Sequence, residues 1–194
     1  MEDEYKSLAE GIVKRWREKK SGQRYIIGIA GSPGSGKTTT AARIGQQLER
    51  LVPGSAVVLP MDGQLDEMSD PIEAHKRRGA PFTFWADGLI TLLKKIKSDT
   101  DSQVLAPSFD HALKDPKEDD IVILPTHQIV IVEGNYILLN QEPWKRIQEE
   151  LLDESIFISC DIDVAMSRLV QRHKQAWGVS PMKRHGRESN RTTI

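Results

Sequence analysis

The segment Gly31–Thr38 constrains the fold of this chain more than any other. It reads Gly-Ser-Pro-Gly-Ser-Gly-Lys-Thr and matches the pattern G-x-x-x-x-G-K-[ST] in full. An apolar run precedes it and a helix-forming stretch follows it, which is the strand, loop and helix order that the pattern requires. Its glycines allow successive N–H groups to turn inward around a phosphate, and the helix N-terminus adds partial positive charge. We therefore expect a phosphate-binding loop rather than a glycine-rich turn that binds nothing.

Within this loop each polar side chain has an expected partner. Lys37 is expected to bridge the β- and γ-phosphates of ATP, and the Thr38 hydroxyl to bind Mg²⁺. The residues predicted to bind the nucleotide are Gly31, Ser32, Pro33, Gly34, Ser35, Gly36, Lys37, Thr38 and Thr39. A loop of this kind occurs in kinases, ATPases and GTPases alike, so other residues have to distinguish them.

The remaining hydrophobic pattern predicts an α/β fold. Four near-continuous apolar runs, typical of strands buried on both faces, cover residues 25–30, 56–61, 128–133 and 155–160. Helical spacing fills residues 37–51, 89–96 and 147–152 and a stretch that begins with Asp163 as N-cap, and residues 3–20 form a further amphipathic helix. Strands that alternate with helices predict a parallel sheet. We expect residues 1–194 to form one phosphate-loop (P-loop) domain, a three-layer sandwich with a mainly parallel sheet.

Residues 98–126 contain few helical signals and several Pro and Asp residues. We expect this segment to be a long excursion over the carboxyl ends of the strands, where ligands bind in open α/β sheets.

Two carboxylates follow predicted strands. Asp62 follows the second strand and Glu133 ends the third. Both should lie at the sheet edge that carries the phosphate loop. Phosphoryl transfer needs one carboxylate to orient or deprotonate the attacking hydroxyl, and a second near the metal is useful. We assign Asp62 as the base and Glu133 as the metal-side residue; the alternative is a loop cap or an ion pair.

Arg168 and Arg172 are four residues apart, so they share one face of the predicted helix. Cations that close over a γ-phosphate stabilise the transition state and exclude water. From their spacing alone, a solvated helix face is the favoured interpretation.

Composition excludes several classes of protein. The chain has 194 residues, 27 Lys plus Arg and 28 Asp plus Glu, for a net charge of −1, which argues against a nucleic-acid partner. No run approaches the ~18 apolar residues of a membrane span, and the acidic N-terminus does not resemble a secretory signal. Cys160 is the single cysteine, so no intrachain disulfide forms. We expect a cytoplasmic protein, with the nucleus left open.

The ordered set of motifs resembles the phosphoribulokinase/uridine kinase family. The matching pieces run from residue 25 to about 178: Gly28-Ile-Ala-Gly-Ser-Pro-Gly-Ser-Gly-Lys-Thr-Thr, Pro60-Met-Asp-Gly, Arg77-Arg-Gly-Ala-Pro-Phe-Thr-Phe, Pro107-Ser-Phe-Asp-His, Val130-Ile-Val-Glu-Gly-Asn-Tyr and Arg168-Leu-Val-Gln-Arg-His. The resemblance implies that Asp62 is the catalytic base and Glu133 the family's acidic residue. It also implies that Arg168 and Arg172 belong to a lid. The residues expected to contact the acceptor are Asp62, Arg78, Phe109, Asp110, His111 and Tyr136.

Two features depart from the family pattern. Trp85 stands where the family has an aspartate, which puts acceptor contacts there in doubt. Residues 179–194 contain three scattered large apolar residues, too few to offset the cost of ordering a strand, so we expect a mobile tail and a sheet that lacks its last strand. The adenine side would then be partly open, and the free sheet edge would favour homo-oligomers.

These motifs favour an ATP-dependent kinase for a hydroxyl on a small metabolite. A nucleoside such as uridine is the acceptor that the resemblance implies, with sugars and pantothenate-type alcohols left open. The second hypothesis is a nucleotide-binding regulatory protein with weakened catalysis. A GTPase is disfavoured because neither an Asn-Lys-x-Asp nor an Asp-x-x-Gly motif occurs.

Overall fold

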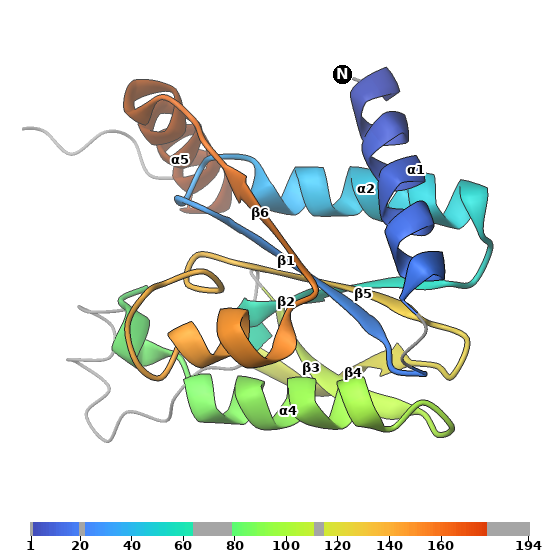
Figure 1. Cartoon of the computed structure of the whole chain (residues 1–194). Coiled ribbons are helices and arrows are strands. Elements are labelled where there is room, and N and C mark those ends of the chain that lie inside the picture. The colour runs from blue at the N-terminus through green and yellow to red at the C-terminus, as the bar shows by residue number, and fades with distance from the viewer. Residues whose placement is uncertain (1, 20–21, 64–78, 111–114, 178–194) are drawn as a thin grey trace, which may run out of the picture.

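The computed structural model describes residues 2–19, 22–63, 79–110 and 115–177 (Figure 1). Its elements are α1 (Glu2–Glu18), β1 (Tyr25–Gly31), α2 (Lys37–Leu51), β2 (Ala56–Pro60), η1 (Met61–Gly63), η2 (Pro81–Thr83), α4 (Ala86–Ser98), β3 (Val104–Asp110), β4 (Asp115–Ile123), β5 (Ile129–Gly134), η3 (Ile147–Leu151), β6 (Glu154–Ile158) and α5 (Ile162–Trp177). Within these ranges no helix has both the length and the apolar character needed to cross a membrane. The predicted tail, residues 179–194, lies outside the described residues.

A parallel sheet carries the fold, in the order β2-β5-β1-β6. Every residue of β1 and β5 is buried, as their continuous apolar runs predict. In β6 the prediction of a strand buried on both faces is wrong: burial alternates along it, and Phe157 is 67% exposed. The reason is its place in the sheet, because β6 has a described neighbour, β1, on one side alone.

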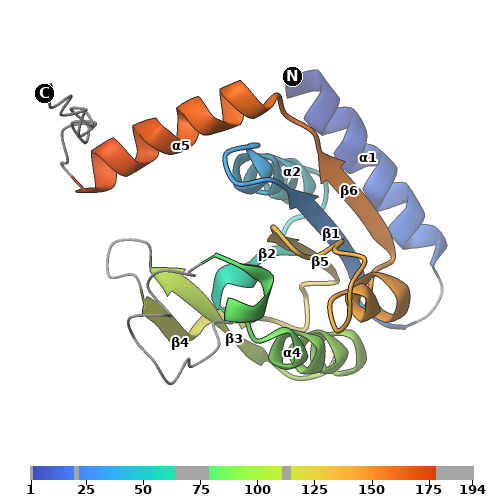
Figure 2. The same cartoon turned by 90° about the vertical axis from the view of Figure 1, so that its left-hand side faces the viewer.

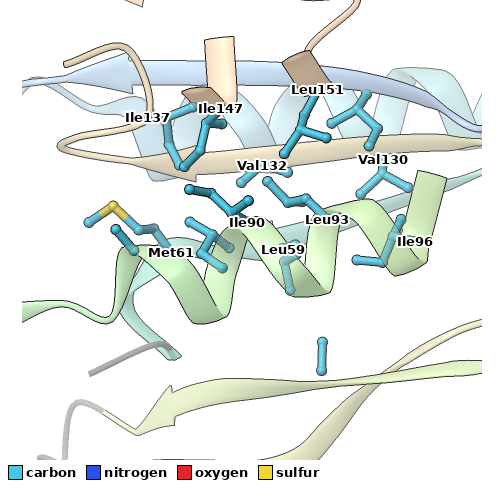
Figure 3. Close-up of a cluster of buried hydrophobic side chains, with 14 of the residues drawn as sticks. Leu59, Met61, Ile90, Leu93, Ile96, Val130, Val132, Ile137, Ile147 and Leu151 are labelled. Carbon is cyan, nitrogen blue, oxygen red and sulfur yellow. The ribbon is translucent and has the colours of Figure 1, made fainter. Parts of the chain in front are cut away.

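Helices cover both faces of this sheet, which confirms the predicted α/β sandwich (Figures 1 and 2). Alternate residues of β5 serve the two sides: Val130 and Val132 belong to the core with α4 and η3, and Ile129 and Ile131 belong to the core with α1 and α2. Figure 3 shows side chains of α4, among them Leu93, directed at Val130 and Val132. The period of two along a strand therefore supplies two separate hydrophobic cores.

Residues 98–126 differ from the irregular excursion that we expected. After the end of α4 they form an antiparallel hairpin of β3 and β4, with Val104 paired to Ile123 and Asp110 to Asp115. The register shifts between Ala106 and Ser108, on either side of Pro107. Proline lacks an N–H donor and interrupts the hydrogen bonds between paired strands. This explains why the sequence did not predict the hairpin. The hairpin packs against η1, the segment that carries Asp62.

The start of α5 also differs by two residues from the prediction. Asp161, rather than Asp163, caps the helix, because its Oδ1 accepts hydrogen bonds from the N–H groups of Asp163 (2.9 Å) and Val164 (3.3 Å). Both aspartates are exposed residues at the helix start, so composition alone could not choose between them.

One buried cation ties the chain together on the side away from the phosphate loop. Arg24 is fully buried. Its guanidinium donates hydrogen bonds to the carbonyls of Ile96 (2.8 Å), His127 (2.9 Å), Leu124 (3.2 Å) and Asp99. It thereby joins the end of α4 to the connection between β4 and β5.

Arg24→Met is expected to lower the free energy of unfolding by about 3–5 kcal/mol, because several buried carbonyls lose their donor together. Urea denaturation would measure the loss. Arg17→Met, at an exposed position of α1, is the matched control and should change stability by less than about 0.5 kcal/mol. A loss below about 1 kcal/mol for Arg24→Met would show that water replaces the guanidinium at these carbonyls.

Candidate active site

The phosphate loop connects β1 to α2 in the shape that its glycines permit. Gly34 and Gly36 have φ angles of 82° and 96°, in the left-handed region that favours glycine. Gly36 is the N-cap residue of α2, so the helix begins at Lys37 with its free N–H groups toward the loop. A Cβ on Gly31 would lie 2.5 Å from the Ser35 hydroxyl, so a side chain there would fill the loop. This geometry fits a bound phosphate.

Glu133 lies directly beside this loop. Its Oε1 accepts a hydrogen bond of 3.0 Å from the Thr38 hydroxyl, and its Oε2 is buried without a partner. β5 brings the carboxylate there, because Glu133 pairs in register with Ile29 of β1 and with Pro60 of β2. A hydroxyl and a buried carboxylate with one free oxygen are a suitable donor set for Mg²⁺. The structure thus brings together the two residues predicted to lie at the metal.

The environment of Glu133 opposes its ionised form. Burial raises the pKa of Glu133, the positive charge of Lys37 and the hydrogen bond from Thr38 lower it, and the negative charge of Asp62 raises it further. The net direction is upward. A carboxylate held in this way would be stabilised by a bound cation.

Asp62 lies in η1, immediately beyond the end of β2. The segment is held in place by close packing, since a Cβ on Gly63 would come within 2.4 Å of the Pro107 carbonyl oxygen of β3. The charge of Asp62 acts on both Glu133 and Tyr136, whose pKa values it raises. Asp62 therefore shares the site with Glu133, as predicted.

α5 brings Arg168 to the phosphate loop. Arg168 Nη1 lies 3.3 Å from the Gly34 carbonyl oxygen, 3.5 Å from that of Ser35 and 3.7 Å from Cys160 Sγ. The backbones also meet closely, since a Cβ on Gly34 would lie 2.4 Å from the Ala165 carbonyl oxygen. Arg172, one turn further along, is exposed. Arg168 is therefore an exposed residue that also contacts the phosphate loop, and its role in a lid stays a prediction.

Tyr136 is held by aromatic neighbours. Its ring lies 5.7 Å from the rings of both Phe84 and Trp144, and its hydroxyl donates to the Gly79 carbonyl. Burial raises the pKa of Tyr136, and Asp62 adds to the rise.

Other predicted contacts are less completely described. Phe109 and Asp110 end β3, and their side chains lie outside the described part of the structure. Arg78 and His111 fall outside the described residues altogether. Their assignment to the acceptor stays a prediction.

One polar residue at this edge was missed. Asn135 follows β5 directly, and its Oδ1 is buried without a hydrogen-bond partner. The sequence could have indicated Asn135, because it lies in the same motif as Glu133 and Tyr136, which both have predicted roles in the site.

The family model described as "Phosphoribulokinase / Uridine kinase family" matches residues 26–182, which include the whole of this site. The chain belongs to this family. A Schizosaccharomyces pombe protein named "Putative uridine kinase" is 41% identical over 79% of this chain and 68% of its own length. The ATP-dependent kinase YFH7 of Saccharomyces cerevisiae is 33% identical over 71% of this chain and 49% of its own length. Our chain therefore spans about half to two thirds of these curated relatives.

Among solved structures, a "putative fructose transport system kinase" from Silicibacter sp. TM1040 superposes with a TM-score of 0.80. It is 30% identical, and the match covers 91% of this chain and 84% of that one. This agreement confirms the P-loop kinase fold.

Trp85, which differs from the aspartate that the family resemblance implies, lies at the start of α4. Trp85 is the N-cap residue of α4 and makes no side-chain cap hydrogen bond. Its ring lies against the first turn instead, since a Cβ on Gly88 would come within 2.3 Å of it. An aspartate in this position is a favourable helix cap. Tryptophan at this position therefore leaves α4 without a side-chain cap.

Glu133→Gln is expected to lower activity by about 10-fold or more, because the amide keeps the Thr38 hydrogen bond but loses the metal-binding charge. Without Mg²⁺ and nucleotide the same change should stabilise the fold at neutral pH. The folded pKa of Glu133 lies above that of a free glutamate, so its ionisation favours the unfolded chain.

That destabilisation is absent below the unfolded pKa of ~4.3 and grows as the pH rises through the folded value. Thermal unfolding in EDTA at pH 4 and pH 8 would measure it. Glu118→Gln, at an exposed position of β4, is the control. A Glu133→Gln variant that is less stable than wild type at pH 8 would contradict this interpretation.

Proposed function

We propose that this chain transfers the γ-phosphoryl group of ATP to a hydroxyl of a small metabolite, and that the acceptor is a nucleoside such as uridine. The observation that carries the proposal is the pairing of Thr38 with a buried Glu133 beside the phosphate loop, with one carboxylate oxygen left without a partner. The curated relative named for uridine kinase activity, at 41% identity, supports the acceptor class.

Each residue then has a part in the reaction. The phosphate loop and Lys37 hold the nucleotide, and Asp62 accepts the proton of the acceptor hydroxyl as it attacks. Thr38 and Glu133 would hold Mg²⁺, which offsets phosphate charge when bound. Arg168, beside Gly34 and Ser35, adds positive charge where the transferred group develops negative charge. Arg172 would join it in a lid.

A sugar is the second candidate for the acceptor, because a relative of known structure is named for fructose transport and matches with a TM-score of 0.80. ADP release should be measured with uridine, cytidine, fructose and pantothenate in turn. The nucleosides are expected to stimulate it most. If fructose alone stimulated ADP release, the acceptor would be a sugar and not a nucleoside. ADP release that ignores all four acceptors would favour the regulatory protein with weakened catalysis.

Location and assembly stay predictions. A cytoplasmic protein is expected from the single cysteine, and homo-oligomers are expected if the edge strand β6 pairs with another copy.

A further inference from the structure

The side chain of Asn135 carries an oxygen that no described residue satisfies. Asn135 is the first residue after β5 and is partly exposed. Its Oδ1 is nevertheless buried, and it has no hydrogen-bond partner among the described residues. A buried acceptor without a donor destabilises a fold, so such atoms usually have a partner in the working protein. A bound ligand is the natural source of the missing donor.

Asn135 is joined to both sides of the catalytic edge. Its chain neighbour Gly134 pairs with Ala30 of β1, the residue directly before the phosphate loop. Gly134 also packs against η1, because a Cβ there would lie 2.4 Å from the Cβ of Met61, the residue before Asp62. The unpartnered oxygen therefore belongs to the edge where the acceptor would meet the transferred phosphate.

The chemistry of an amide oxygen limits what can bind it. The oxygen accepts hydrogen bonds and donates none. The phosphates of ATP, the part of the nucleotide that this edge would receive, are ionised at neutral pH and also only accept. The attacking hydroxyl has a single proton, which it gives to Asp62 under the proposed function. The donor to Asn135 must therefore be another group of the acceptor or a water molecule bound to the metal.

The surroundings favour the acceptor over the metal. Glu133 and Thr38 already offer a metal ion one unpartnered carboxylate oxygen and one hydroxyl. Asn135 leads instead into Tyr136, whose pKa is raised by burial and by the negative charge of Asp62. The residues on both sides of Asn135 thus adjoin the segment that carries the proposed base.

We propose that Asn135 Oδ1 accepts a hydrogen bond from a second hydroxyl of the acceptor, close to the hydroxyl that attacks. This inference rests on the proposed function and adds a requirement to it: the acceptor is a polyol. Asn135 selects this class without choosing among its members, because ribose and other sugars all carry several hydroxyls. A site with a buried acceptor atom discriminates against an analogue that lacks the matching hydroxyl, since the atom is then left unpaired.

The test compares uridine with 2′,3′-dideoxyuridine, which keeps the base and the hydroxymethyl group but lacks both ring hydroxyls. Wild type should have a kcat/KM at least about 10-fold higher for uridine. In Asn135→Leu, which nearly keeps the size of the side chain, this ratio should fall at least about 5-fold, because uridine alone loses a partner. Asn135→Asp keeps an acceptor oxygen and should keep the ratio. Asn140→Leu, at an exposed position of the same segment, is the matched control and should behave like wild type.

A purely structural role for Asn135 would lower kcat/KM equally for both compounds, so an unchanged ratio in Asn135→Leu would overturn the inference. Asn135→Ala removes the same oxygen and gives the same comparison if the leucine variant does not fold. The affinity for Mn²⁺ in the presence of ATP, measured by electron paramagnetic resonance, should be equal in wild type and variant. Weaker Mn²⁺ binding in the variant would assign Asn135 to the metal instead.

The same experiment separates this inference from the proposed function. Equal kcat/KM values of wild type for both nucleosides would overturn the role of Asn135 and leave the kinase activity standing. If wild type turned over neither compound, the proposed nucleoside acceptor would itself be contradicted, and the inference with it.

Discussion

Asp62→Asn is expected to lower kcat by about 10²–10⁴-fold with little change in the affinity for ATP and Mg²⁺. The amide has nearly the size of the carboxylate and can still orient a hydroxyl, but it cannot accept its proton. η1 holds the residue firmly against β3, so the variant should keep its place in the structure. Single-turnover kinetics with saturating acceptor would measure the chemical step.

The control for this change is Asp101→Asn, at an exposed aspartate after α4. It should leave kcat unchanged. If Asp62→Asn instead abolished binding of ATP with Mg²⁺ while kcat held, Asp62 would be the metal-side residue, and the roles of Asp62 and Glu133 would be exchanged.

Lys37→Ala is expected to reduce turnover by about 10³-fold or more, because the loop loses the charge that bridges the β- and γ-phosphates. The fold should stay intact, since Lys37 is the first residue of α2 and belongs to neither hydrophobic core. Circular dichroism and a thermal melt would verify folding. Nucleotide binding should also weaken.

Lys95→Ala provides the comparison, since Lys95 is exposed on α4, on the other face of the sheet. Full activity in Lys37→Ala would show that the phosphate loop does not take part in the reaction, whatever the acceptor.

The sequence predicted the parts of the site that depend on local order. The phosphate loop is local, and Glu133 and Asp62 could be placed because parallel strands that end at one edge bring their next residues together. The contact of Arg168 could not be predicted from its spacing, because the spacing shows which residues share a helix face but not which part of the fold that face contacts. The structure supplied that neighbour through the approach of α5 to Gly34.

The errors share a physical cause, since each depended on a tertiary contact. β6 has the apolar composition of a central strand but lies at an edge. Pro107 lies within β3, so the sequence indicated an irregular segment there. Asp161 and Asp163 are equally good caps until the helix start is known.

Close backbone contacts at the catalytic edge limit how this enzyme family can vary here. A Cβ on Gly34, Gly63 or Gly134 would come within 2.4 Å of a neighbouring atom, on α5, β3 and η1 respectively. A substitution at Gly34 would press on α5, which carries Arg168, and one at Gly63 or Gly134 would disturb the packing of η1, which carries Asp62. Divergence toward new acceptors would therefore have to arise in the side chains of the hairpin and of the segment before α4, which surround this edge without forming it. Under the proposed function, we therefore expect that exchange of these surrounding segments would change acceptor specificity while the close contacts at the edge are kept.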